Sequence, residues 1–423
     1  MVKGVRLRSR RALVFLSCLL VLVVAGIITV RLAQGDDKPT EVARSAGESA
    51  CSARKTREHC DEIHLDGRTW RYAYRPAEKA TADTVLLDFG GPGLSALSGS
   101  LGLGPFLEAY PQLSKRYNFL VIEEPWVMRA LPDGCDAAMS GYYLAYRDAT
   151  GGGVAATKSM VDKCDLRGGG WGFDRESYGK LVKAIAQKHG SQLKGFIGHS
   201  WGATRLAYLG KDAPEWSILL RPFPVGVDSE TLVRTRAQLT ATLYPAVAQV
   251  TGSRIDTRSL EVTQFDQASA IVDLGYVPSE YLAAESAGVR DGSGLAQIGK
   301  LSDALWGRYG TDSLSPGNLA QFQEICAVVG PLAAQPLTIT TSADALAARF
   351  APCAGFSRNG LVASASPTTC VVTSKYDSVA PEGLARSTYG TLPGNVKFVD
   401  TDEKSHSSFA GMEACLTHVG IAN

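Results

Sequence analysis

Apolar residues fall into short continuous runs along the chain, separated by glycine, proline and polar residues. Runs of this length are typical of strands that are buried in a parallel sheet. We predict strands, or strand ends, at residues 68–74, 84–89, 119–122, 196–197, 218–220, 369–374 and 396–400.

Between the runs at 119–122 and 196–197, apolar residues recur every three or four positions, which is the spacing of a helix. Tyr178, Leu181, Val182 and Ile185 recur at helical spacing, and Gly190 marks the end of the helix. Strands that alternate with helices predict an α/β fold, with a mostly parallel, doubly wound sheet.

Residues 228–350 show mostly helical signals. We predict a helix through Leu243 after a cap at Asp228 or Ser229, and further helices at 295–309 and 318–329. No strand of the sheet is needed there, so we expect a helical cap inserted into the sheet domain. The core would then consist of a first part at 51–227 and a second part at 351–423.

The first 31 residues carry six basic residues and no acid, and Leu13–Val30 is an uncharged run. This pattern predicts a signal peptide or a membrane-spanning signal anchor over residues 1–31. No clean Ala-x-Ala cleavage site follows, which favours the anchor. Residues 32–50 are polar and are expected to be a flexible tether. We therefore expect a cell-membrane protein with its main part outside, or a secreted protein.

The charge balance excludes one class of partner. The whole chain has 43 basic and 42 acidic residues, so 37 basic and 42 acidic residues remain after the first 31. We expect no nucleic-acid partner for a chain with this balance.

The cysteines agree with an oxidising compartment. One of the nine, Cys18, lies in the apolar run, and the other eight are Cys51, Cys60, Cys135, Cys164, Cys326, Cys353, Cys370 and Cys415. Pairing neighbours along the chain, in that order, gives four disulfides, which is one of 105 possible arrangements. Because there is no Cys-x-x-Cys pair or histidine cluster, we expect no metal and no cofactor.

The sequence Gly198-His199-Ser200-Trp201-Gly202 fits the pattern G-x-S-x-G. Glycine is 44 of 423 residues, so the pattern alone could arise by chance. Here, however, it follows the apolar run Phe196-Ile197 and precedes the helix-favouring residues 203–209. A strand, a sharp turn and a helix make a nucleophile elbow, which would expose the Ser200 hydroxyl on a strained turn.

A glycine-rich turn, Gly90-Gly91-Pro92-Gly93, directly follows the predicted strand at 84–89. Backbone N–H groups can approach a substrate oxygen closely where side chains are absent. This turn is therefore a candidate for one half of an oxyanion hole.

A serine hydroxyl needs a base, and the base needs an acid to orient it. Only His406 and His418 follow the elbow in the chain, and His418 lies in a predicted terminal helix. Asp377 follows the strand at 369–374, so both Asp377 and His406 would emerge at the edge of the sheet where the serine lies. Asp400 and Asp402 are alternative acids, closer to His406 in sequence.

Four short segments resemble one family. The Gly-Gly-Pro-Gly turn, the Gly-x-Ser-Trp-Gly elbow, the segment 377–381 (Asp-Ser-Val-Ala-Pro) and the late His406 with Cys415 after it are similar to the prolyl aminopeptidase and secreted tripeptidyl aminopeptidase group of α/β hydrolases. The resemblance implies that Ser200 is the nucleophile, Asp377 the acid and His406 the base. It also implies an oxyanion hole from the N–H groups of Gly91 and Trp201.

The chain departs from the family at three points. Phe89 stands where the family has histidine, Glu123-Glu124-Pro125-Trp126 replaces an Asp-x-Arg-Gly segment, and no cap motif for the acids that hold a peptide amino terminus is recognisable. The prediction is an extracytoplasmic serine hydrolase, with an exopeptidase acting on short peptides as the first hypothesis. An esterase or lipase-type acyl hydrolase is the alternative enzyme, and an inactive hydrolase fold serving as a binding module is the alternative of another class.

Overall fold

The computed structural model describes residues 59–97, 103–149, 151–250, 260–333 and 338–421. The predicted anchor at 1–31, the tether at 32–50 and Cys51 lie outside these residues. Among the helices of the described part, none combines the length and apolar character that a membrane span requires.

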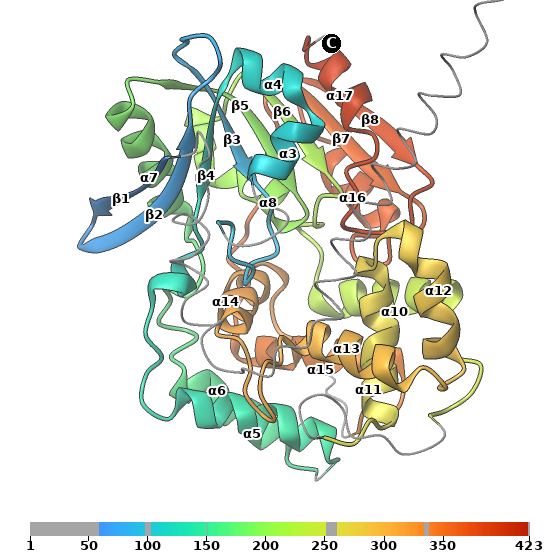
Figure 1. Ribbon diagram of the computed structural model, residues 1–423. Helices are drawn as coiled ribbons and strands as arrows, with labels where there is room; N and C mark the ends of the chain where they lie inside the picture. Colours follow the sequence, from blue (N-terminus) through green and yellow to red (C-terminus); the bar gives the residue numbers. More distant parts are fainter. Residues whose placement is uncertain (1–58, 98–102, 150, 251–259, 334–337, 422–423) are drawn as a thin grey trace, which may run out of the picture. The chain divides into compact units, whose positions relative to one another are not determined.

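A single sheet of eight strands organises the described part of the chain (Figure 1). Its order is β1-β2-β4-β3-β5-β6-β7-β8. Strands β1 and β2 are antiparallel to each other, β2 is antiparallel to β4, and the remaining neighbours are parallel. The strands are β1 (His59–Leu65), β2 (Arg68–Arg75), β3 (Asp83–Asp88), β4 (Asn118–Ile122), β5 (Gln192–His199), β6 (Trp216–Leu220), β7 (Thr368–Ser374) and β8 (Asn395–Thr401).

The predicted mostly parallel α/β sheet is confirmed, and one strand is an addition. Strand β1 is an edge strand of largely charged and polar residues, and the apolar pattern does not show it. The segment forms a strand because seven of its residues pair with β2, although its own side chains do not indicate a strand.

Both faces of the sheet are covered by helices, because the central strands are buried on both sides. Val85 and Leu87 of β3 pack with α3 (Leu103–Ala109), α4 (Pro111–Arg116) and α17 (Met412–His418). Leu86 points to the opposite face, as strand alternation requires, where the following helices pack: α7 (Arg175–Lys188), α9 (Leu206–Leu209) and α16 (Glu382–Tyr389). Helix α7 begins where Asp174 accepts hydrogen bonds from two free backbone N–H groups.

The helices between β6 and β7 lie beyond one end of the strands (Figure 1). We refer to them as the cap: α10 (Ser229–Leu243), α11 (Gln264–Asp273), η3 (Leu274–Tyr276), α12 (Ser279–Arg290), α13 (Leu295–Trp306), α14 (Gly317–Val329), α15 (Ser342–Phe350) and η4 (Ala351–Gly355). Asp228 caps α10 by accepting a hydrogen bond from the Thr231 N–H at 2.7 Å.

Two helices from an earlier part of the chain pack against the cap. They are α5 (Cys135–Arg147) and α6 (Gly153–Lys163), which lie between β4 and β5 and for which the sequence pattern predicts nothing. The Tyr142 hydroxyl of α5 donates a hydrogen bond to the Ala348 carbonyl of α15 at 2.8 Å. Arg147 forms a buried ion pair with Asp266 of α11 at 2.6 Å. The cap therefore packs against helices from a separate stretch of sequence.

Three disulfides lie within the described residues, and they follow the expected pairing of neighbours: Cys135–Cys164, Cys326–Cys353 and Cys370–Cys415. Cys60 is also disulfide-bonded.

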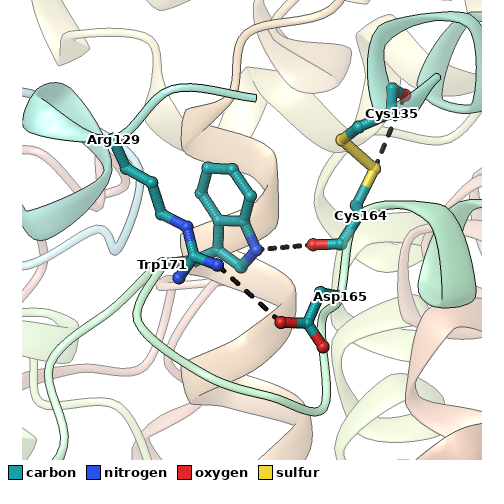
Figure 2. The surroundings of a disulfide bond; sticks show 5 residues. All are labelled: Arg129, Cys135, Cys164, Asp165 and Trp171. Atoms are coloured by element: carbon teal, nitrogen blue, oxygen red, sulfur yellow. Dashed lines mark hydrogen bonds and ion pairs between the residues drawn. A yellow bond between two sulfur atoms is a disulfide. The ribbon is translucent and has the colours of Figure 1, made fainter. Parts of the chain in front are cut away.

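Figure 2 shows how the first disulfide holds the loop that follows α6. The indole N–H of Trp171 donates to the Cys164 carbonyl at 2.8 Å, and the Arg129 guanidinium lies over the indole ring at 4.3 Å. Arg129 also pairs with Asp165, the residue after Cys164, at 3.9 Å. Trp171, which is fully buried, is thereby held between the disulfide-bonded end of α6 and Arg129 after η1 (Pro125–Met128).

Removing the disulfide beneath the last two strands should destabilise the protein strongly. Cys370 of β7 and Cys415 of α17 close a loop of 45 residues, so the variant Cys370→Ala/Cys415→Ala should lose about 4 kcal/mol of unfolding free energy by the chain-entropy model. Chemical denaturation of the full-length chain measures this. A loss below about 1 kcal/mol would show that α17 is held by packing alone.

Candidate active site

Ser200 lies on a sharp turn between β5 and α8 (Trp201–Thr204). Its backbone has φ 54° and ψ −124°, an unfavourable conformation for a residue with a side chain. Strand β6 and the segment after it hold the turn, since the Ser200 N–H donates to the Leu220 carbonyl at 2.9 Å and the Phe223 N–H donates to the Ser200 carbonyl at 3.1 Å. A side chain on Gly202 would lie 2.2 Å from the Asp88 carbonyl oxygen, so only glycine fits there.

The side chains of Ser200, His406 and Asp377 form one hydrogen-bonded line. His406 Nε2 is 2.7 Å from Ser200 Oγ, and His406 Nδ1 is 2.8 Å from Asp377 Oδ2. Asp377 and His406 are almost fully buried, while 9% of the surface of Ser200 is exposed to solvent. These are the distances at which a base can take the serine proton while an acid fixes its tautomer.

Asp377 is held as a carboxylate by its surroundings. Burial alone would raise its pKa, but His406, Arg221 and the Ala380 N–H outweigh burial, and the pKa falls below its ordinary value. Its other oxygen, Oδ1, accepts hydrogen bonds from the N–H groups of Val379 and Ala380 at 2.9 Å each. Arg221 Nη1 lies 3.7 Å from Oδ2. Asp377 can therefore stabilise a positive imidazole.

The two rival acids lie elsewhere. Asp400 accepts a hydrogen bond from the Thr373 hydroxyl and pairs with Arg386. Asp402 pairs with Lys375 at 2.9 Å and is exposed. The structure thus brings Asp377, and neither of these two residues, to His406.

A second histidine positions the first, and sequence reasoning missed it. His199, the residue before the serine, lies 2.8 Å from the His406 carbonyl oxygen through Nε2. Burial, together with the nearby His406, lowers the pKa of His199 to about 3, so the ring is neutral and donates its Nε2–H to that carbonyl. His199 occupies the first variable position of G-x-S-x-G, so the motif does not indicate this role.

The cap also holds His406 directly. The His406 N–H donates to the Gly275 carbonyl of η3 at 2.8 Å, and the Ser407 hydroxyl donates to the Tyr276 carbonyl at 3.2 Å. The Tyr276 ring meets the imidazole edge to face, with centroids 5.5 Å apart. A side chain on Gly275 would lie 2.6 Å from Ser378 Oγ, so the same turn touches the loop of Asp377.

The two predicted oxyanion donors both border the cavity next to Ser200. Within the described residues, neither the Gly91 N–H nor the Trp201 N–H has a hydrogen-bond acceptor. Phe89, where the resembling family has histidine, packs edge to face with Phe106 and Phe409. This departure adds an apolar contact beneath the turn and leaves the two N–H groups available.

The glycine-rich turn is fixed by a backbone contact with the cap. A side chain on Gly93 would lie 2.3 Å from the Gly317 carbonyl oxygen, and one on Gly317 would lie 2.1 Å from the Gly93 carbonyl oxygen. Gly317, the first residue of α14, therefore limits how closely the glycine-rich turn can approach the cap.

Behind the elbow, four charged side chains form a buried cluster: Asp88, Glu124, Arg205 and Glu324. The Arg205 guanidinium contacts Glu124 and Glu324 at 2.7 Å each and Asp88 at 3.3 Å. Glu324 also accepts hydrogen bonds from the Trp201 indole at 2.6 Å and from the Phe173 N–H at 2.9 Å. Arg205 interrupts the helix expected at 203–209, which is present as α8 and α9 on either side of it.

The second departure from the family lies at this cluster. Glu124 is one of its carboxylates, and Glu123 accepts hydrogen bonds at 2.7 Å from the Ser95 hydroxyl and the Ala96 N–H. Of these two acids, Glu124 pairs with Arg205 and Glu123 holds the segment after the glycine-rich turn.

A cavity of about 440 Å³ opens at Ser200 beneath the cap. Apolar side chains of the cap form much of its wall, and its polar and charged lining consists mainly of Arg236, Asp273, Tyr276, Asn318, Gln321 and Arg349. Nowhere in the described ranges do three His, Cys, Asp or Glu side chains come together in a way that could hold a metal ion.

The arrangement decides the fold. A mostly parallel sheet carries a serine on a strand-turn-helix elbow after β5, an acid after β7 and a histidine after β8, in the chain order Ser, Asp, His. The chain has the α/β-hydrolase fold. No protein-family model and no curated protein matches it.

Several solved structures resemble the chain at low sequence identity. A serine hydrolase from Cycloclasticus zankles is 12% identical over 86% of this chain and 99% of its own, with a TM-score of 0.37. The enol-lactonase from Burkholderia xenovorans is 13% identical over 85% and 99%, with a TM-score of 0.34. A thermophilic esterase from Thermogutta terrifontis is 13% identical over 82% and 92%, with a TM-score of 0.35. At these scores the fold assignment rests on the strand order and the elbow.

Replacing Gly317 by alanine should displace the glycine-rich turn. The new methyl group would meet the Gly93 carbonyl, and a shift of the oxyanion donors should slow reaction at the serine roughly 10- to 100-fold. The measurement is the second-order rate of labelling by a fluorophosphonate. Gly383→Ala is the matched control, because nothing lies within 4 Å of the added carbon. Equal labelling rates for both variants would contradict the role of this contact.

Stability should fall as pH rises from 5 to 8, in part through Glu124. Burial raises the pKa of Glu124 from 4.5 to about 8, although Arg205 opposes the rise. Between these values the folded state keeps a proton that the unfolded state releases, so the unfolding free energy decreases with pH and levels off above 8. Asp273, whose pKa burial raises to about 7, acts in the same direction.

The test is denaturant unfolding at several pH values. Glu124→Gln should show a smaller decrease in unfolding free energy between pH 5 and 8 than the unmodified chain. Glu176→Gln, which alters an exposed acid, should leave the decrease unchanged. If Glu124→Gln gives the same decrease as the unmodified chain, the proton is not on Glu124.

Proposed function

We propose that the protein is a serine hydrolase that works through an acyl-enzyme. The observation that carries the proposal is the line of hydrogen bonds from Ser200 through His406 to Asp377, at 2.7 and 2.8 Å. In the first step Ser200 Oγ attacks the substrate carbonyl and passes its proton to His406 Nε2. The N–H groups of Gly91 and Trp201 bind the oxygen on which negative charge develops.

Asp377 stabilises the imidazolium that forms, since its carboxylate remains ionised. His406 then gives the proton to the departing amine or alcohol, which leaves Ser200 acylated. In the second half a water molecule loses a proton to His406 and attacks the acyl group, which restores the serine.

For the substrate we propose short peptides, cleaved by exopeptidase action. Asp273 at the end of α11 lines the cavity with only 8% of its surface exposed. Within the described part of the chain no group donates a hydrogen bond to its carboxyl oxygens. A peptide amino group would supply the missing donor and the opposite charge.

The apolar part of the wall favours the second candidate, an esterase or other acyl hydrolase. Phe223, Leu305, Phe322, Leu346 and Phe350 border the cavity. An acyl chain would bury apolar surface against them.

The same proposal includes an extracytoplasmic location. Three disulfides lie within the described residues, and disulfides persist in oxidising compartments. We propose that residues 1–31 either anchor the chain in the membrane or direct its secretion.

The test begins with labelling. A fluorophosphonate should label the full-length chain and should fail to label Ser200→Ala, whereas Ser387→Ala, which removes an exposed serine outside the cavity, should label normally. Aminoacyl and tripeptidyl amides are then compared with short and long acyl esters. Ser200-dependent amide cleavage supports the exopeptidase, and ester cleavage alone supports the acyl hydrolase. Absence of both labelling and turnover would leave a binding module as the function.

A further inference from the structure

Five arginines are buried in the described part of the chain, and they divide into two groups. Arg205, Arg221 and Arg308 lie outside the cavity or behind its wall, and each pairs with at least one carboxylate. Arg236 of α10 and Arg349 of α15 line the cavity, and neither forms an ion pair with any acid in the described residues. Their exposed fractions are only 7% and 8%.

The contacts of these two arginines leave donors unused. Arg349 Nη2 donates to Asn318 Oδ1 at 3.0 Å and also to Gln321, while its guanidinium lies 4.9 Å from the centre of the Phe322 ring. Its Nη1, however, is buried without a hydrogen-bond partner among the described residues, and the same is true of Arg236 Nε.

Such an arrangement is costly unless an anion enters. Burial lowers the pKa of Arg349, and the nearby positive charge of Arg236 adds to the effect. Asp273 offsets only part of this charge, since its own pKa of about 7 leaves it partly protonated at neutral pH. A buried cation without an anionic partner is unfavourable, and arginine matches a carboxylate with paired N–H donors.

The position of the pair connects it with the reacting serine. Tyr276 is in edge-to-face contact with the His406 ring, and its hydroxyl interacts with Arg236. Arg236 is in turn close enough to Arg349 for its charge to lower the pKa of Arg349. The guanidinium groups therefore share one cavity with Ser200, on the cap side.

We propose that Arg236 and Arg349 form a carboxylate-binding subsite, so that the preferred substrate carries a free carboxylate on the part that enters the cavity. The inference rests on the proposed function for its turnover readout, although carboxylate binding itself does not require hydrolysis. The subsite would restrict the enzyme to acidic acyl compounds or to peptides with a free carboxyl group, and would discriminate against neutral esters of the same size.

Two esters of glutaric acid test the proposal, because they differ only at the far end of the acyl chain. Mono-4-nitrophenyl glutarate carries a free carboxylate, and its methyl ester does not. The unmodified full-length chain should hydrolyse the free acid with a kcat/KM roughly 10- to 100-fold higher, the range expected for a charge-assisted hydrogen bond. In Arg236→Gln this preference should fall to about 3-fold or less. Arg234→Gln, which removes an exposed arginine from the same helix, should retain it in full.

Arg349→Gln should show the same loss, with thermal unfolding as the check on folding, because Arg349 also holds Asn318 and Gln321. If Arg349→Gln does not fold, the variants Arg236→Gln and Arg236→Lys test the subsite in its place. The lysine variant should keep part of the preference, since it retains the charge and loses the planar fork. Equal hydrolysis of both esters by the unmodified chain, or a preference that survives in Arg236→Gln, would overturn the subsite.

Direct binding separates the two proposals. Calorimetric titration with glutarate, and with glutaramide as its neutral analogue, is carried out on the unmodified chain and on Arg236→Gln. Glutarate binding that requires Arg236 would support the subsite even if no Ser200-dependent hydrolysis were found, in which case only the hydrolase proposal fails. Ser200-dependent hydrolysis without any preference for glutarate over glutaramide would leave the hydrolase standing and end the carboxylate proposal.

Discussion

One guanidinium group, that of Arg205, joins four parts of the molecule that must stay in register for the elbow to form. Its partners come from the end of β3, the segment after β4 and the cap helix α14, while Arg205 itself belongs to the chain just beyond the serine. Burial raises the pKa of Glu124 to about 8, and the charges of Glu324 and Asp88 add to the rise, so Glu124 holds a proton at neutral pH. Loss of one member of a buried pair typically costs 3–5 kcal/mol. The turn at Ser200, the glycine-rich turn after Asp88 and the cap wall are thus fixed by a single set of contacts.

The sheet could be predicted from the sequence because its central strands are buried on both faces and read as continuous apolar runs. Ser200, Asp377 and His406 could be placed together because the ends of parallel strands meet at one edge. The edge strand β1 and the helices α5 and α6 could not be found in this way. The polar side chains of β1 give no apolar period, and Tyr142 and Tyr143 of α5 are buried against cap residues more than a hundred positions later in the chain.

The supporting residues of the site were hidden for a related reason. Nothing in the sequence around Arg205 indicates that its acids lie at 88, 124 and 324, since these residues are far apart in the chain and meet through the packing of the sheet and the cap. His199 illustrates the same limit, because its hydrogen bond reaches a carbonyl more than two hundred residues away. The departure at Glu123-Glu124 likewise gives no sign in the sequence that Glu124 pairs with Arg205, which lies 81 residues further along the chain.

The contact between η3 and the histidine loop has a consequence for how this protein could change. Asp273 and Tyr276 shape the cavity, and Gly275 between them holds the backbone of His406. Residues 273–276 therefore contribute both to the shape of the cavity and to the position of His406, so a change in one would affect the other. A cap from another hydrolase, grafted at the ends of β6 and β7, would bring a new cavity but would leave the histidine loop unsupported. In this protein the cap supports the loop of His406 directly, so exchanging the cap would also remove that support.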